Sequence, residues 1–166
     1  MAEPLPFAYD LLPPGYIRLL TPDPVDDSDG YSWSLEVVSL DQPDFVFEAL
    51  SYVWGSQSET YPIRCNGRSL HVHHNPFTTL PYLSRRGDIP PVQAIWIDAI
   101  CINQEDQEEK RVQIQLMGQL YRTAKKVWVW LGLAEHQEII PGAVDVLFRI
   151  VAAAQRHPRT LTPLET

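Results

Sequence analysis

Hydrophobic positions in the first third of the chain follow the two-residue period of β-strands. Residues 16–20 form a short apolar run, and residues 32–40 alternate apolar with polar side chains, as a half-exposed strand does. A third run, residues 46–54, is apolar on both faces and stops at Gly55. We expect the first two strands to pair antiparallel and the third to lie inside a covered sheet.

A hairpin and a helix are predicted next. Residues 62–70 contain an Asn-Gly pair between two short runs, which is the strongest short hairpin signal because both central residues need positive φ. Asn75 and Pro76 have the pattern of a helix start, with Asn as the N-cap and Pro at the first helical position. Pro81 should kink or shorten this helix. Its apolar positions are Phe77, Leu80 and Leu83.

The densest apolar run, residues 95–102, predicts a strand that is buried on both faces. A long helix should follow from near Glu105 to Ala124, because its first turns are acidic, its end is basic and it has a broad apolar face. Residues 127–131 predict a second strand buried on both faces. Together these elements indicate a right-handed βαβ unit whose two strands are parallel and adjacent.

The chain should form one domain. Its 166 residues, 45% of them hydrophobic, suffice for a single core of ordinary size. The proline-rich residues 1–15 should be an extended lead-in, and residues 16–156 the domain, closed by a helix at residues 143–155. Residues 157–166 should be a tail.

The composition limits the classes of binding partner and the cellular compartment that we expect. A net charge of −8 and a pI of about 5.0 disfavour nucleic acid or an anionic membrane as the main partner. Two cysteines make no disulfide framework, and Cys101 should be a small buried residue. The sequence begins without the pattern of a signal peptide, and no apolar stretch reaches the roughly 20 residues that span a bilayer. We therefore expect a cytoplasmic protein without a membrane span.

Three long motifs stand in order along the chain. They are EALSYVWG at residues 48–55, WIDAICINQ at residues 96–104, and a spaced motif that begins at Glu109 and ends in VWLG at residues 129–132. Between its ends the third motif contains Gln113, Met117, Tyr121 and Ala124. With these motifs the chain closely resembles the HET domain, the fungal heterokaryon incompatibility module, and the motif core covers residues 45–132.

The resemblance implies an effector of fungal non-self recognition that triggers regulated cell death. HET domains are similar to TIR domains, which are flavodoxin-like modules that signal by assembly, and some of which cleave NAD with a glutamate. The expected fold is therefore α/β, with a TIR-like, mostly parallel sheet flanked by helices, plus an N-terminal antiparallel strand pair and a hairpin. The expected partners are further copies or other proteins, including a sensor of the NLR type. No cofactor is required, and NAD is a candidate substrate.

The motif residues give candidate ligand contacts. Asp98 is either a site carboxylate or a structural anchor that accepts N–H bonds from the turn at residues 101–104, since a buried carboxylate must be paired. Asn103 either contacts a nucleotide or caps the helix that follows, and Gln104 lies beside it past the end of a strand. Other candidate contacts are Ser51, Tyr52 and Trp54, of which Trp54 either packs in the fold or stacks on a base.

An NAD-cleaving site needs a carboxylate that stabilises the positive charge developing on the ribose. Glu48 and Glu138 are the candidate catalytic residues, with Glu135 as a further candidate, and a solvated surface role is the alternative for each. His71 and His73 share a strand face but have no clear third ligand, so we predict no metal site. Three functions remain open: an assembly module, an NAD-hydrolysing enzyme completed by assembly, and a scaffold that recruits another protein.

Overall fold

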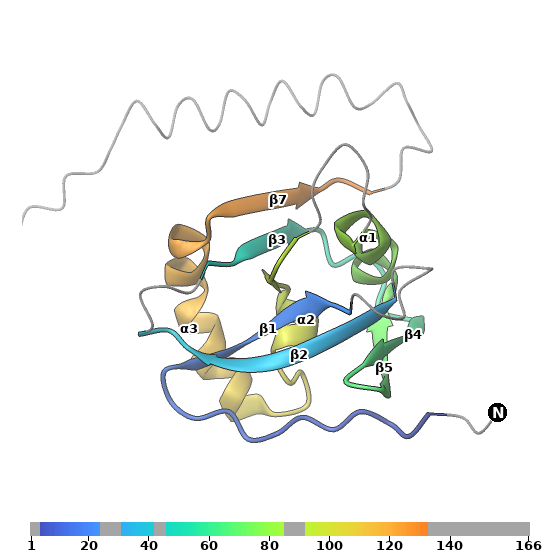
Figure 1. Cartoon of the computed structure of the whole chain (residues 1–166), viewed down its shortest axis with the longest axis horizontal. Coiled ribbons are helices and arrows are strands. Elements are labelled where there is room, and N and C mark those ends of the chain that lie inside the picture. Colours follow the sequence, from blue (N-terminus) through green and yellow to red (C-terminus); the bar gives the residue numbers. More distant parts are fainter. Residues whose placement is uncertain (1–3, 24–30, 42–45, 85–91, 133–166) are drawn as a thin grey trace, which may run out of the picture. The chain divides into compact units, whose positions relative to one another are not determined.

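The computed structural model describes residues 4–23, 31–41, 46–84 and 92–132, which build a seven-stranded sheet with three helices (Figure 1). In chain order the elements are β1 (Tyr16–Pro22), β2 (Ser32–Ser39), β3 (Glu48–Tyr52), β4 (Thr60–Cys65), β5 (Arg68–His73), α1 (His74–Ser84), β6 (Ile95–Trp96), α2 (Asp98–Cys101), α3 (Gln107–Thr123) and β7 (Lys126–Trp130). The fold is α/β, as predicted. The helix and tail predicted at residues 143–155 and 157–166 lie outside the described residues.

The sheet is mixed, with the strand order β5-β4-β2-β1-β6-β3-β7. β3 pairs parallel with both β6 and β7, so the strands before and after α3 run in the same direction, as predicted. They are not adjacent, however, because β3 lies between them. Three of the six pairings are parallel (β2–β4, β3–β6, β3–β7) and three are antiparallel (β1–β2, β1–β6, β4–β5). The sheet is less parallel than expected because the N-terminal strand pair lies in its middle.

The N-terminal strand pair and the hairpin are both confirmed. β1 and β2 are antiparallel, with Leu20 opposite Leu35, and β4 and β5 form the hairpin across Asn66 (φ 50°) and Gly67 (φ 73°). The side chain of Asn66 also bonds to β2: its Oδ1 accepts from the Leu35 backbone N–H at 2.8 Å, and its Nδ2 donates to the Leu35 carbonyl at 3.1 Å. The turn residue therefore also fastens the hairpin to the rest of the sheet.

Helix α1 begins at His74, so the prediction of Asn75 as its N-cap is wrong. Asn75 lies inside the helix, and its Nδ2 donates to the carbonyl of Val53 just after β3. That tertiary bond uses the side chain that would otherwise cap the helix. The helix continues past Pro81 to Ser84. Its predicted apolar positions do face the core, with Leu80 and Leu83 buried and Phe77 partly buried.

The run predicted as one strand at residues 95–102 divides into the two-residue β6 and the four-residue α2. Every residue from Ile95 to Ile102 is buried except Ala99, but the strand prediction is wrong beyond Trp96. Asp98 starts the helix, and its Oδ1 accepts a 2.7 Å bond from the backbone N–H of Ala99. The periodicity of a short apolar run cannot separate a strand from one buried helical turn.

Helix α3 matches the predicted long helix, but Asp106 is its N-cap, so the capping role predicted for Asn103 is wrong. The Asp106 carboxylate accepts from the backbone N–H groups of Glu108 and Glu109, each at 3.0 Å. Asn103 lies in the preceding turn, where its Oδ1 accepts from the backbone N–H of Glu105 at 3.2 Å. Asp and Asn cap helices about equally well, so neighbouring candidates are hard to tell apart by residue type.

Strand β7 is half exposed, and the prediction that both its faces are buried is wrong. Val127 is 39% exposed and Val129 is 53% exposed, whereas Trp128 and Trp130 pack against the core. Among the described residues β7 pairs only with β3 and is the last strand in the order. An edge position explains why an apolar sequence is only partly covered.

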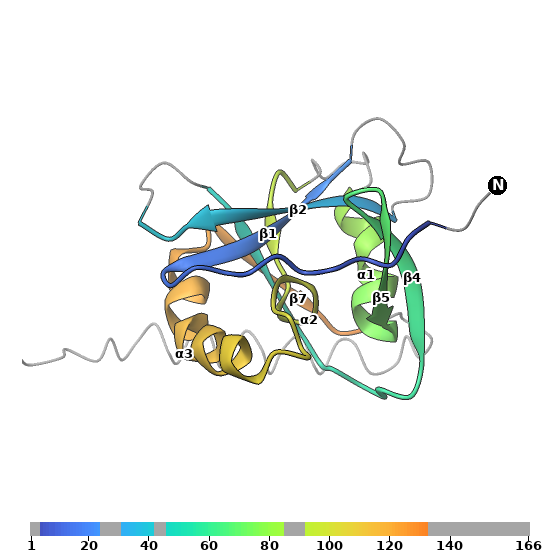
Figure 2. The same cartoon turned by 90° about the horizontal axis from the view of Figure 1, so that it is seen from below.

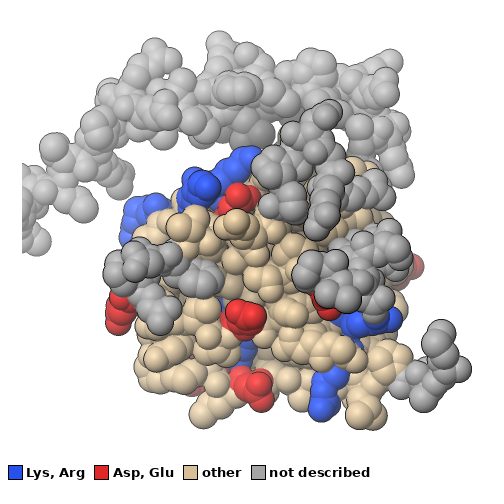
Figure 3. Space-filling view, in the orientation of Figure 1, with Lys and Arg blue, Asp and Glu red and all other residues tan. Residues whose placement is uncertain are grey.

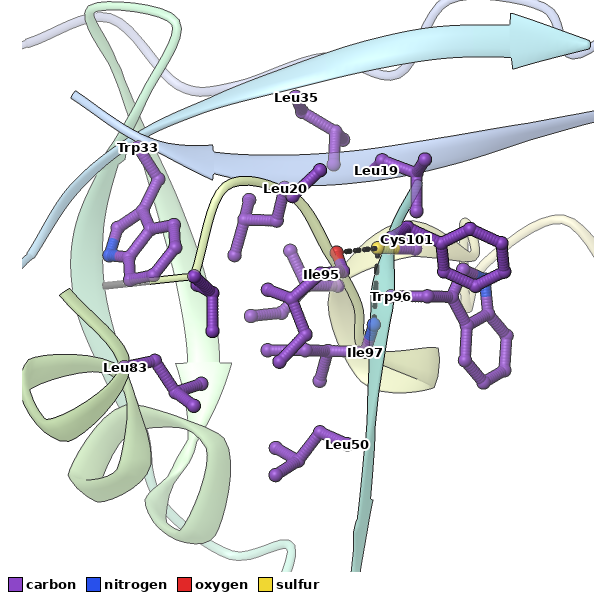
Figure 4. Packing of buried hydrophobic residues seen from close by; sticks show 14 of the residues in the cluster. Leu19, Leu20, Trp33, Leu35, Leu50, Leu83, Ile95, Trp96, Ile97 and Cys101 are labelled. Carbon is purple, nitrogen blue, oxygen red and sulfur yellow. Dashed lines mark hydrogen bonds between the residues drawn. The ribbon is translucent and has the colours of Figure 1, made fainter. Parts of the chain in front are cut away.

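The core lies on both sides of the central strands. In Figure 4 the side chains of Leu50, Leu83 and Ile97 lie on one side of β3, whereas Trp96 extends to the other. Neighbouring residues of β6 point to opposite faces, as strand geometry requires. Within the described part of the chain, no helix is long and apolar enough to cross a bilayer.

The N-terminal segment, residues 4–14, lies along β5 and α2 before the chain enters the sheet (Figure 2). Pro6 forms a parallel bridge with Ser69 of β5, through Phe7 N–H to Ser69 O at 2.8 Å and Ser69 N–H to Leu5 O at 2.9 Å. Farther along, the hydroxyl of Tyr9 donates to the carbonyl of Ile100 in α2 at 2.8 Å. The segment therefore covers the outer edge of β5 at Ser69.

Candidate functional site

The candidate residues Trp54 and Asp98 meet where β3 and β6 end. Nε1 of Trp54 donates to Oδ2 of Asp98 at 3.0 Å, and Oδ1 of Asp98 accepts from the backbone N–H of Ala99 at 2.7 Å. Asp98 is only 8% exposed, so its charge needs both of these donors. The donors are Ala99 and an indole from a different strand end, not the turn at residues 101–104 that the anchoring role predicted.

Two tyrosines surround this carboxylate. The hydroxyl of Tyr52 is buried and has no hydrogen-bond partner of good geometry among the described residues, and burial first and then the neighbouring Asp98 raise its pKa. The hydroxyl of Tyr121, on α3, donates to the Leu50 carbonyl at 3.0 Å, and burial together with Asp98 raises its pKa to about 12. Both phenols are therefore neutral proton donors near one negative charge.

The indole of Trp54 also has a cation nearby. Nζ of Lys110, on α3, lies 6.0 Å from the centre of the Trp54 ring, at the outer limit of a cation–π contact. Gly55 follows with φ +68°, and a Cβ there would lie 3.0 Å from Nδ2 of Asn75. The chain after β3 is thus held by α1, α2 and α3, and Trp54 keeps only part of its surface exposed.

Asn103 and Gln104 hold the loop between α2 and α3. Nε2 of Gln104 donates to the carbonyls of Asp98 at 2.9 Å and Ile102 at 3.4 Å, and its Oε1 is buried with no partner in the described part of the chain. The backbone N–H of Asn103 donates to Oε1 of Glu109 at 2.7 Å. Both residues lie close to Asp98 in the chain, and their present bonds are structural.

Glu48 lies at the opposite end of β3 from Tyr52. The two Cα atoms are separated by four strand steps, about 13 Å at 3.3 Å per residue. The Glu48 carboxylate accepts from Nε1 of Trp128 on β7, and Nζ of Lys126 lies 3.4 Å from the centre of the same indole ring. The structure therefore does not bring Glu48 together with Trp54 and Asp98.

The remaining candidate site residues either lie apart from Trp54 and Asp98 or fall outside the described residues. Ser51 is partly buried in the middle of β3, and its side chain points to the opposite face from that of Tyr52 because strand residues alternate. Glu135 and Glu138 lie outside the described residues. His71 and His73 belong to β5, beside a hollow of about 480 Å³ lined by Pro4, Pro6, Pro62, Ser69 and His71. In the described ranges, no three His, Cys, Asp or Glu side chains form a group that could hold a metal ion.

A buried ion pair joins Arg18 of β1 to Glu109 of α3, and the sequence pattern did not predict it. Nη1 and Nη2 of Arg18 contact Oε1 and Oε2 of Glu109 at 2.6 and 3.0 Å, and Arg18 is 2% exposed. The guanidinium also donates to the carbonyls of Asp10 and Cys101 and lies over the Tyr9 ring, 4.9 Å from its centre. One available signal was the arginine itself, which interrupts an apolar strand run.

Comparisons with known proteins agree on one family. The family described as "Heterokaryon incompatibility protein (HET)" matches residues 47–162. Among curated proteins, "Heterokaryon incompatibility protein 6, OR allele" of Neurospora crassa is 36% identical over 145 residues, which cover 77% of this chain and 21% of that protein. The chain thus spans about a fifth of the length of this relative. No solved structure matches.

Proposed function

Because the chain belongs to the heterokaryon incompatibility (HET) family, we propose that it is an effector of fungal non-self recognition that triggers regulated cell death through protein contacts. The contacts are with further copies of the chain or with another protein, such as a sensor of the NLR type. We place this action in the cytoplasm. The named relative is five times longer than the matched region, so the trigger can reside in a separate part of a larger protein.

The way the candidate carboxylates are used supports assembly as the mode of action. Asp98 and Glu48 each accept a bond from an indole N–H, of Trp54 and Trp128 respectively, at opposite ends of β3. Each bond fastens a strand end to a neighbouring element. Because both of these carboxylates form framework bonds, the described residues support a contact surface as the means by which the family role is carried out.

Controlled expression tests this proposal. The chain, fused to a domain that dimerises when a small molecule is added, is expressed in a compatible filamentous fungus, and dye uptake by hyphal cells reports death. We expect death to rise when the dimeriser is added, because assembly is the activating step. A Leu50→Asp variant, which places a charge in the core, should be inert. Survival of cells that accumulate the folded, dimerised protein would contradict the proposal.

A second candidate function is NAD cleavage with release of nicotinamide, completed by assembly. The observation that favours it is the group formed by Tyr52, Trp54 and Asp98: an aromatic ring, a carboxylate and a buried tyrosine hydroxyl beside that carboxylate gather where open α/β sheets bind ligands. Glu138, and Glu135 as the further candidate, stay proposals because they lie outside the described residues. Glu48 is disfavoured by its distance from this group.

The two candidates give different results in one assay. Purified protein, with and without the dimeriser, is incubated with NAD, and nicotinamide is measured by chromatography. If the chain is an enzyme, we expect the parent protein to release nicotinamide. The Asp98→Asn and Glu138→Gln variants should then release none, and the Glu48→Gln variant should keep its activity. If assembly alone is the function, the dimerised protein kills cells but releases no nicotinamide.

A further inference from the structure

The two edges of the sheet differ in how they are covered. At the β5 edge, residues 5–7 of the same chain occupy the outer hydrogen-bonding groups around Ser69, and Pro4 and Pro6 lack the N–H donors that would attract another strand. At the β7 edge, the described residues provide only β3 as a partner. An uncovered edge strand is a template for pairing with a further strand.

Strand β7 also has the composition of a strand that pairs. Strand β7 has one charged residue, Lys126 at its start, and no proline. The residues that follow, 127–131, are the uncharged run Val-Trp-Val-Trp-Leu, which is the pattern of a segment that forms intermolecular β-structure. Val127 and Val129 are 39% and 53% exposed on one face. Gly132, with φ +98°, marks the end of the run. An edge of this kind is a liability unless a partner covers it.

We propose that β7 pairs antiparallel, edge to edge, with β7 of a second copy, centred on Trp128. This inference rests on the proposed function, because it names the surface through which the effector contacts a further copy. In this register Val127 lies opposite Val129 of the second copy, so both exposed valines gain an apolar neighbour on the same face. Lys126, whose Nζ already lies over the Trp128 ring of its own chain, lies opposite Trp130 of the second copy.

Charge selects the antiparallel arrangement. Figure 3 shows basic side chains gathered over the region where Figure 1 places the end of α3 and the start of β7, to which Arg122, Lys125 and Lys126 belong. Parallel pairing in register would place the lysines of two copies side by side, and like charges directly opposite are destabilising. Antiparallel pairing places them at opposite ends of the joint strand pair.

The symmetry of the contact determines the size of the assembly. A β7–β7 contact is isologous, since each copy contributes the same surface, and it closes after two copies. At the β5 edge of each copy the N-terminal segment bonds to Ser69, which opposes the addition of a further strand there. We therefore infer a dimer in which two seven-stranded sheets join into one.

Sedimentation of the purified full chain across a dilution series tests the dimer. We expect the mass to rise from 19.0 kDa to twice that value, and Val129→Lys to remain monomeric at concentrations where the parent chain is dimeric. Val37→Lys is the matched control, because Val37 is similarly exposed (42%) but lies on β2 inside the sheet. A parent chain that stays monomeric, or a Val129→Lys variant that still dimerises, overturns the proposal.

Cysteine cross-linking tests the register and does not depend on Val129→Lys folding. Opposed positions are close enough for a disulfide, so a mixture of Val127→Cys and Val129→Cys chains should cross-link on oxidation, whereas each variant alone should cross-link far less. If each variant alone cross-linked as much as the mixture, the register would be refuted.

The dimer and the proposed function can fail separately. If Val129→Lys is monomeric yet still kills cells when dimerised by the fused domain, the proposed function stands and β7 serves only native assembly. If the folded parent chain never kills, the proposed function fails independently of the β7 contact.

Discussion

The indole nitrogen of Trp54 donates a 3.0 Å hydrogen bond to Oδ2 of Asp98, and this bond joins the end of β3 to the start of α2. Because Asp98 is buried, the bond satisfies a charge that water cannot reach well. Burial first, and then this carboxylate, raise the pKa of Tyr52 and of Tyr121. One side chain thus joins the residues that follow β3 to α2.

Replacing Trp54 by Phe should lower the free energy of unfolding by about 1–3 kcal/mol, because a buried carboxylate loses a donor while the aromatic packing is kept. Urea denaturation followed by circular dichroism measures the change. In a double-mutant cycle with Asp98→Asn the two effects should be less than additive. Strict additivity would mean that the bond contributes nothing to stability.

Of the substitutions considered, breaking the buried ion pair between Arg18 and Glu109 should lower the free energy of unfolding the most. Arg18→Met leaves the Glu109 carboxylate buried beside Asn103 without its cation, and such a loss costs about 3–5 kcal/mol. The exposed pair Arg111–Glu108 is the matched control, and Arg111→Met should leave the unfolding midpoint unchanged within error. Similar midpoints for the two variants would show that the Arg18 contact is not a stabilising one.

The two thiols should make the protein less stable in alkali. Burial raises the pKa of Cys65 and of Cys101 from 9.0 to about 12, so on raising the pH the unfolded chain loses these protons first. The free energy of unfolding should therefore be unaffected by the thiols below pH 9 and fall as the pH rises from 9 toward 12. A Cys65→Ala, Cys101→Ala double variant should show a shallower decline.

A thiol reagent gives an independent check on the same burial. At neutral pH neither cysteine should react in the native protein, because the thiolate is the reactive form and both side chains are buried. Both should react in denaturant. Rapid reaction of one cysteine in the native state would show that its surroundings are open.

Gly55 should tolerate a methyl group less well than Gly15 does. Both residues have positive φ, +68° and +79°, so Ala at either position costs roughly 1–2 kcal/mol for the left-handed backbone. At Gly55 the added Cβ would also lie 3.0 Å from Nδ2 of Asn75, whereas at Gly15 nothing lies within 4 Å. Thermal or chemical unfolding of the two alanine variants should rank Gly55→Ala as the less stable. Equal losses would mean that Asn75 moves aside without cost.

Local patterns predicted the elements that depend on neighbouring residues. The antiparallel pair β1–β2, the hairpin turn at Asn66 and the long α3 follow from alternation, turn chemistry and helical periodicity. The extent of β6 could not be predicted from local patterns, because an apolar run of eight residues suits a strand and a buried helical turn equally well. The exposure of β7 could not be predicted either, because an apolar sequence does not reveal whether another layer covers it.

The candidate site was predictable in its residues but not in its partners. Two different motifs indicated Trp54 and Asp98 as candidates, and the bond between these residues crosses 44 positions of the chain. Arg18 and Glu109 are 91 positions apart, and no local pattern relates two such residues. Pairings of this kind depend on the order of strands in the sheet, which the sequence analysis did not predict.

The place of β1 and β2 has a consequence for the boundaries of the domain. The family match starts at residue 47, yet these two earlier strands connect the β4–β5 hairpin to the three strands β6, β3 and β7. A fragment that began where the match begins would lose the centre of its sheet and with it the buried side chains of Ile17, Leu19, Leu20 and Trp33. The smallest portion able to fold on its own must therefore start upstream of the family's recognisable motifs.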